Sequence, residues 1–202
     1  MPALEQAKRV AEKLTGLHRP DRDALSRLVR ARPPCQFRFA DDGETPNNPK
    51  WPLLIYRSPV KLENAFDPAA IFEELFASNG WMDSWRDGVY DFLHFHTHRH
   101  EVLGIARGSV EIAFGGAKGK RLRLNAGDVT ILPAGTGHRR IEASDELLVV
   151  GAYPQDSGEY DQPTPGDASH REAAMNISKV PKPKFDPIYG YEGPLIRLWL
   201  WR

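Results

Sequence analysis

The sequence has a single cysteine, no excess of charge of either sign and no long hydrophobic run among its 202 residues. Because Cys35 has no second cysteine to pair with, an intramolecular disulfide is excluded, and a reducing compartment is the default. No window approaches the ~20 consecutive apolar residues that a membrane-spanning helix needs, and the N-terminal stretch lacks the apolar core of a secretory signal. We therefore expect a cytoplasmic protein with no membrane partner.

The charges are balanced, with 27 Lys plus Arg against 27 Asp plus Glu. A net charge of zero gives no global field that would attract nucleic acid, so we expect no nucleic-acid partner. Hydrophobic residues make up 41% and charged residues 27% of the chain, which are ordinary values for a globular protein. The length allows one domain with a full core and is short for two.

The first 34 residues differ in pattern from the rest and predict a helical arm. Leu4, Ala7, Val10 and Leu14 recur at helical spacing, and the pair Pro33-Pro34 ends the segment. Its eight basic residues against four acidic ones suggest a DNA-binding role. Packing against the body or a sister subunit explains this basic face better, because two short helices are too little for a helix-turn-helix domain.

Short strands are predicted from residue 90 to residue 153, where apolar residues repeat every second position. Residues 109–114 and 121–124 flank the turn GGAKGK and predict an antiparallel hairpin with one wet face. Further strands are predicted at 128–132, 138–143 and 146–153, and at the C-terminus in GPLIRLWLW. The pattern indicates an all-β sandwich or small barrel.

Two other segments have patterns of their own. Residues 67–80 predict a helix that Asp67 caps and Gly80 ends. Residues 154–194 are rich in Pro, Gly and Asp, with a helical stretch around ASHREAAMN. A loop of this length in a small domain is expected to be an ordered strap that touches the barrel mouth.

Four histidines occupy alternate positions in the stretch DFLHFHTHRHEVLG, and a glutamate follows them directly. Residues two apart in a β-strand face the same side, so His94 and His96 can both point into one interior. A turn in THRH would re-aim the chain and bring Glu101 opposite them on the next strand. His138 is the candidate for a further ligand, and the roles of the other two histidines stay open on the residues alone.

Two gapped motifs in this region resemble those of the cupin superfamily. The matching positions are Gly88, His94, His96, Glu101 and Gly108 in the first motif and Gly127, Pro133, Gly135 and His138 in the second. One position departs from the pattern, because Glu142 stands where the family usually has an Asn that is not a ligand. The segments DDGETPNNPKWPLLIY, HEVLG, VVGAYP and DPIYGYEGPL further look like the small bacterial YjlB-type cupins.

The resemblance implies an all-β fold, a single jelly-roll cupin domain over residues 35–202 in the form of a double-stranded β-helix barrel. Its motif core is 88–153, and the helical arm at 1–34 lies outside it. It also implies that one divalent metal ion per chain is bound by four ligands, namely His94, His96, Glu101 and His138. An alternative register that uses His96 and His98 would break the motif spacing. Residues expected at structural turns are Gly88, Gly108, Gly127, Pro133 and Gly135.

Several other side chains near the motifs are weaker candidates. His100, Tyr90 and Tyr153 could orient a ligand or act as acid or base in the pocket, and His98 is expected to be a solvated turn residue. Three arginines near the motifs could steer a carboxylate substrate, although exposed strand positions explain them better. They are Arg107, Arg139 and Arg140.

Three imidazoles and one carboxylate would leave two coordination positions of an octahedral ion open. This ligand set suits Fe, Mn, Ni, Co, Cu and Zn. The resemblance therefore favours a metal-dependent enzyme acting on a small oxygen-rich compound, with oxygenase chemistry ahead of isomerase or lyase chemistry. A non-catalytic protein that binds or senses a sugar or acid is the alternative. A transcriptional regulator that binds DNA through the basic arm is a remoter one. Because cupins commonly pair through their sheets, a homodimer is expected.

Overall fold

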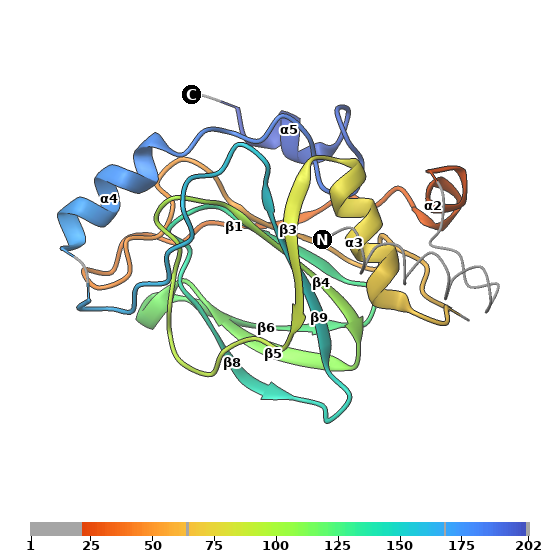
Figure 1. Cartoon of the computed structure of the whole chain (residues 1–202). Coiled ribbons are helices and arrows are strands. Elements are labelled where there is room, and N and C mark those ends of the chain that lie inside the picture. The colour runs from red at the N-terminus through yellow and green to blue at the C-terminus, as the bar shows by residue number, and fades with distance from the viewer. Residues whose placement is uncertain (1–21, 64, 168, 201–202) are drawn as a thin grey trace, which may run out of the picture.

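The computed structural model describes residues 22–63, 65–167 and 169–200 (Figure 1). Of the predicted helical arm at 1–34, residues 22–34 are described, and only helix α2 (Arg22–Leu28) within them is helical; the predicted helix before it lies outside the described residues. Leu25 of α2 is buried in the same apolar cluster as the following helix, α3 (Pro68–Ser78). The described end of the arm therefore packs on the body of the protein.

The described strands form two antiparallel sheets. The larger has the order β1 (Cys35–Phe37), β2 (Leu53–Tyr56), β7 (Val129–Leu132), β4 (Glu101–Arg107), β9 (Leu148–Pro154) and β3 (Trp81–Asp87). The smaller has the order β6 (Lys120–Asn125), β5 (Ser109–Phe114) and β8 (His138–Ala143), and the short helix η1 (Gly116–Lys118) joins β5 to β6. The all-β prediction is confirmed in its coarser form, a mostly-β protein with antiparallel sheets, but the described strands form two sheets and not the one closed barrel that was expected.

The four central strands of the larger sheet are buried on both faces, because their successive residues enter two different cores, whereas the edge strands β1 and β3 are largely exposed. Leu103 and Ile105 of β4 pack against Ile112 and Phe114 of β5 in the core between the sheets. The intervening residue Val102 faces the opposite side, where α3 and α5 (Pro194–Leu198) cover the sheet. Figure 1 shows these helices on one side of the larger sheet and the smaller sheet on the other. Glu101 shares the parity of Leu103 and so points between the sheets.

Several predicted elements are confirmed. The hairpin of β5 and β6 pairs Val110 with Leu124, and both are buried while the arginines of β6 stay exposed. Helix α3 begins after Asp67, whose Oδ1 accepts hydrogen bonds from Ala69 N and Ala70 N. Such an N-cap satisfies backbone donors that have no partner within the helix.

Two predicted strands are wrong. The C-terminal segment forms the helix α5, because Pro194 suits a first turn and Leu195 and Trp199, four residues apart, both point into the core. Residues 91–96 do not form a regular strand either, although one isolated antiparallel bridge joins His94 to His138. The alternation of histidines there matches strand spacing without the hydrogen-bonded ladder of a strand.

The predicted strap is ordered and contains the helix α4 (His170–Lys179). Before α4, the strap lies against the histidine-rich segment, because Phe95 N donates to Pro163 O at 3.2 Å and Gly158 N donates to His98 O at 3.2 Å. The histidine-rich segment is thus held between β8 on one side and the strap on the other. None of the helices in the described part of the chain is long and apolar enough to cross a membrane.

Candidate metal centre

Three histidines from two distant parts of the chain converge between the sheets. His94 and His96 come from the segment after β3, and His138 is the first residue of β8. The bridge between His94 and His138 has hydrogen bonds of 3.2 Å and 2.9 Å, and the two ring centroids lie 4.1 Å apart. All three histidines are buried, and each offers a ring nitrogen within 4.8 Å of the others. The triad could therefore hold a metal ion.

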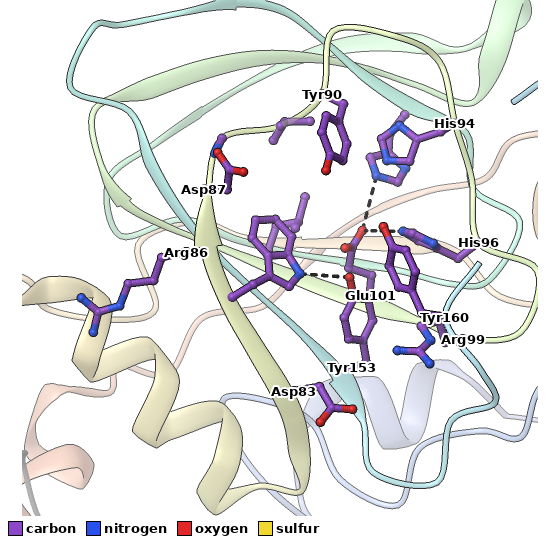
Figure 2. Close-up of a pocket in the computed structure, with 15 residues that line it drawn as sticks. Asp83, Arg86, Asp87, Tyr90, His94, His96, Arg99, Glu101, Tyr153 and Tyr160 are labelled. Atoms are coloured by element: carbon purple, nitrogen blue, oxygen red, sulfur yellow. Dashed lines mark hydrogen bonds and ion pairs between the residues drawn. The ribbon is translucent and has the colours of Figure 1, made fainter. Parts of the chain in front are cut away.

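Glu101, the first residue of β4, completes the cluster (Figure 2). Its Oε2 lies 3.5 Å from His96 Nε2 and 3.3 Å from His138 Nε2, and Glu101 is 3% exposed. This oxygen is nevertheless buried without a hydrogen bond. A buried carboxylate oxygen with no donor is costly, whereas a cation among the four side chains would satisfy it. Three imidazoles and one carboxylate are a donor set that fits a divalent transition metal.

Each of the three rings is oriented by a backbone carbonyl. His94 Nδ1 lies 3.1 Å from Phe92 O, His138 Nδ1 lies 3.1 Å from Thr136 O, and His96 Nδ1 is hydrogen bonded to Asp161 O. In each case Nδ1–H donates to the carbonyl, which leaves the lone pair of Nε2 for a metal. The strap thus takes part in the site through Asp161.

The electrostatics also favour metal binding. Burial, together with the neighbouring His138, lowers the pKa of His94 to about 3, so this ring is neutral near pH 7. Burial alone would raise the pKa of Glu101, but the adjacent His96 and His138 hold it below its ordinary value. Burial opposes a proton on His96 as well, yet Glu101 raises the pKa of His96. The Glu101 carboxylate thus favours positive charge between the histidines, which a bound metal ion would supply.

The other two histidines of the stretch lie outside the cluster. His98 is half-exposed, and its ring contacts Thr97 Oγ1 at 2.9 Å and Asp161 Oδ2 at 3.3 Å. His100 is buried, and its Nδ1 accepts from Ala134 N at 2.8 Å while its Nε2 donates to Pro181 O at 3.1 Å. Both nitrogens of His100 are therefore used, so it can serve neither as a ligand nor as a free acid or base. It ties the strap to the turn before β8.

A cavity of about 540 Å³ opens next to the cluster. Its lining residues are Asp83, Trp85, Arg86, Asp87, Gly88, Val89, Tyr90, His94, His96, Arg99, Glu101, Leu103, His138, Tyr153 and Tyr160. Tyr90 and Tyr153, both candidates from the sequence, are among them. Trp85, Arg99 and Tyr160 carry no motif signal, and only the fold brings them here. Figure 2 shows Arg99 and Tyr160 beside the cluster.

One wall of the cavity depends on a glycine in β9. The indole ring of Trp85 lies over Gly151, where an added Cβ would approach ring atoms to 2.1 Å. In this position Trp85 Nε1 donates to the hydroxyl of Tyr153 at 2.9 Å. Burial and the charge of Glu101 raise the pKa of Tyr153, so its hydroxyl keeps its proton near neutral pH. Tyr153 can therefore donate a hydrogen bond toward the interior of the site.

The three arginines considered as steering residues do not line this cavity. Arg107 and Arg139 are exposed, and Arg140 lies 3.8 Å from Asp91 in a surface ion pair. Their placement agrees with ordinary strand positions on the wet face. The arginines that do line the cavity are Arg86 and Arg99.

The glycines of the two motifs differ in whether their backbone conformation requires glycine. Gly108, Gly127 and Gly135 have φ values of 69°, 91° and 88°, in the left-handed region that favours glycine. Gly135 is also crowded, because a Cβ would lie 2.7 Å from Asn47 O. Gly88 is not among the glycines with positive φ, and a Cβ there would meet nothing nearer than 4.0 Å. Backbone conformation therefore does not account for Gly88.

Comparisons with known proteins bear on the family. No family model matches the chain. The protein YjlB of Bacillus subtilis (strain 168) is 36% identical over 164 residues, which is 81% of this chain and 95% of that protein.

Similar solved structures include oxalate decarboxylase from Bacillus subtilis, at 19% identity and a TM-score of 0.35, and acireductone dioxygenase from Bacillus anthracis with cadmium, at 18% and 0.32. They align with 58% and 45% of this chain, but the match covers only 28% and 61% of their own chains. At these scores they carry no argument about its chemistry.

The facing antiparallel sheets, the two motifs and the buried histidine cluster define a cupin. The extent of its identity with YjlB is more specific. The chain belongs to the YjlB family of cupins.

Proposed function

We propose that the protein is a metal-dependent cupin enzyme that binds one divalent ion per chain through His94, His96, Glu101 and His138. The observation that carries this proposal is the buried Glu101 Oε2, which faces Nε2 of two histidines and accepts no hydrogen bond. The two sheets would correspond to the two halves of a jelly roll. When bound, such an ion would supply a Lewis acid with open positions for substrate oxygens.

The proposed substrate is a small oxygen-rich organic compound, and oxygenase-type chemistry is favoured over isomerase or lyase chemistry. Fe, Mn, Ni, Co, Cu and Zn all suit this donor set, and a redox-active member of the series would suit an oxygenase. The chain's own contribution is to bind and orient the substrate between aromatic walls that limit access of water. The Tyr153 hydroxyl, held by Trp85, would donate a hydrogen bond to a substrate oxygen.

A non-catalytic binding or sensing protein is the second candidate, and one observation favours it. The histidines that line the cavity all belong to the proposed ligand set, and His100 has both nitrogens hydrogen bonded. No uncommitted imidazole among the described residues is therefore present there as a general base. Oxygen consumption or product formation with hydroxy acids, diketones and catechols would favour the enzyme. Tight ligand binding without turnover would favour the sensor.

Metal content tests the ligand assignment directly. We expect protein purified without chelator or affinity nickel to contain about one transition metal per chain by elemental analysis. His96→Ala and Glu101→Ala should each lose most of the metal, because a ligand is removed from a site of four. His98→Ala is the matched control from the same segment and should keep it. Full occupancy in His96→Ala would show that the assignment is wrong.

The homodimer and the cytoplasmic location expected from the sequence also stay proposals. Sedimentation of the metal-loaded protein at several concentrations would show whether it pairs. A mass that stays at that of one chain, 22.8 kDa, would contradict the dimer.

A further inference from the structure

Arg99 is a buried cation in the wall of the cavity. It is 8% exposed, and its guanidinium carbon lies 4.6 Å from the ring centroid of Tyr153 and 5.5 Å from that of Tyr160. One of its terminal nitrogens, Nη2, donates to Gly158 O. Its Nε is buried and has no hydrogen-bond partner. No carboxylate in residues 22–63, 65–167 or 169–200 forms an ion pair with it.

This placement leaves charge uncompensated. A buried guanidinium is normally paired with a carboxylate, because removing it from water is costly otherwise. The faces of two phenol rings offset part of that cost, but they leave N–H groups at the edge of the guanidinium without acceptors. Two further acids line the cavity, Asp83 and Asp87, and both are exposed, so water screens their charges.

The net charge of the cavity interior also favours an anionic ligand. This step rests on the proposed function, because it counts the charge of the proposed metal ion. A divalent ion, the Glu101 carboxylate and the Arg99 guanidinium together give a net charge of about +2, since the three imidazoles are neutral ligands. A cavity with this charge and several aromatic walls favours an anionic occupant. The volume of about 540 Å³ leaves space for an organic body as well.

We propose that Arg99 determines substrate specificity by binding a carboxylate group, so that the substrate is a small organic acid. The planar guanidinium can present two parallel N–H groups to the two oxygens of a carboxylate. Trp85, Tyr90 and Tyr160 line the same cavity and offer ring faces and edges to the carbon skeleton of the acid. The three strand arginines considered from the sequence are replaced in this role by Arg99, which lies in the irregular segment just before β4.

The test measures binding and does not need turnover. Lactate, succinate, benzoate and salicylate are each paired with the corresponding amide and titrated into the metal-loaded protein by calorimetry. We expect at least one acid to bind the wild type roughly tenfold or more tightly than its amide. Arg99→Gln should lose this preference while keeping its metal by elemental analysis. Arg99→Lys, which retains the charge but not the planar fork, should keep part of it.

Arg140→Gln is the matched control, because it removes one positive charge from β8 without touching the cavity lining. It should leave the preference unchanged. If the wild type binds metal but binds none of the acids more tightly than its amide, the proposed role of Arg99 is wrong and the proposed metal site is unaffected. An unchanged preference in Arg99→Gln would lead to the same conclusion. A wild type that binds no metal would instead overturn the proposed function, and if Arg99→Gln does not fold, the wild-type and Arg99→Lys titrations still decide.

Discussion

At the scale of single residues, the centre depends as much on backbone groups as on the ligands. The carbonyls of Phe92, Thr136 and Asp161 fix the three rings, and Gly135 N donates to His96 O at 2.7 Å. The loop around Gly135 therefore holds the segment that carries the first two histidines. Because its φ of 88° and the nearby Asn47 carbonyl both exclude a side chain, this position should tolerate substitution poorly.

Gly135→Ala tests that requirement. We expect it to lower the free energy of unfolding of the metal-free protein by about 2 kcal/mol, from a strained φ and a contact that the backbone must relieve. Gly166→Ala is the matched control, because Gly166 has a φ of 97° but open space around it. It should cost less, since only the strain remains. Urea unfolding of both variants gives the comparison, and equal losses would contradict the role of crowding.

At the scale of elements, the strap and the histidine-rich segment support each other. The Asp161 carboxylate accepts from Thr97 N at 3.0 Å and from Thr97 Oγ1 at 2.6 Å, while the Asp161 carbonyl accepts from His96. One strap residue thus anchors the segment by its side chain and orients a ring by its backbone. Groups that orient a metal ligand are worth much of the affinity of a site.

Asp161→Ala should therefore weaken metal binding about 10- to 100-fold, because the carbonyl that orients His96 is no longer held in place. Competition with a chromophoric chelator measures the affinity. Asp167→Ala is the control, since Asp167 accepts hydrogen bonds from Thr164 within the exposed part of the strap. It should leave the affinity unchanged. If both variants bind metal like the wild type, the strap does not position His96.

The elements also show how far the sequence can predict this protein. Helix α3 is predicted by its N-cap and its apolar stripe, and the β5–β6 hairpin is predicted by its alternating apolar residues. Each of these signals lies within a short stretch of sequence. Local signals fail for residues 91–96, whose backbone groups bond to His138, Pro163 and Gly135 rather than to one strand. They fail in the C-terminal segment too, where alternation suggests a strand but the stacking of Trp199 on Trp51 at 5.3 Å stabilises a helix.

The candidate site, like the fold, is predicted only in part from the sequence. The four proposed ligands lie at motif spacings, so a family resemblance can point to them from the amino-acid sequence alone. Three other residues reach the cavity from elements that the sequence pattern does not mark. Arg99 lies in the irregular segment before β4, Trp85 in a strand that the alternation does not predict, and Tyr160 in the strap. Their positions depend on long-range packing, such as the ring of Trp85 over Gly151, which sequence spacing does not encode.

At the scale of the whole molecule, the centre lies between two sheets that contact each other mainly through apolar side chains. Ligands come from the larger sheet, from the smaller sheet and from the segment that precedes β4. A metal ion bound by these ligands would link the two sheets in addition to its proposed role in catalysis. Binding to the folded state alone stabilises that state by mass action.

Removal of metal should therefore lower thermal stability. With free metal at about 100 times its dissociation constant, we expect a gain of about 2.7 kcal/mol, or roughly 5 to 10 °C in Tm, over the chelator-treated protein. Differential scanning calorimetry with and without EDTA measures the shift. Glu101→Ala should show almost no shift. A wild-type Tm that does not respond to metal would contradict an ion that joins the two sheets.

The anchoring of His96 by the strap has a consequence for biosynthesis. All four proposed ligands have been translated by the end of β8, yet the carbonyl that orients His96 and the phenol of Tyr160 come only after β9. A nascent chain still held at the ribosome at that point would carry every ligand without a finished pocket. We therefore expect metal loading to follow synthesis of the strap, when ions meet a folded centre rather than loose imidazoles.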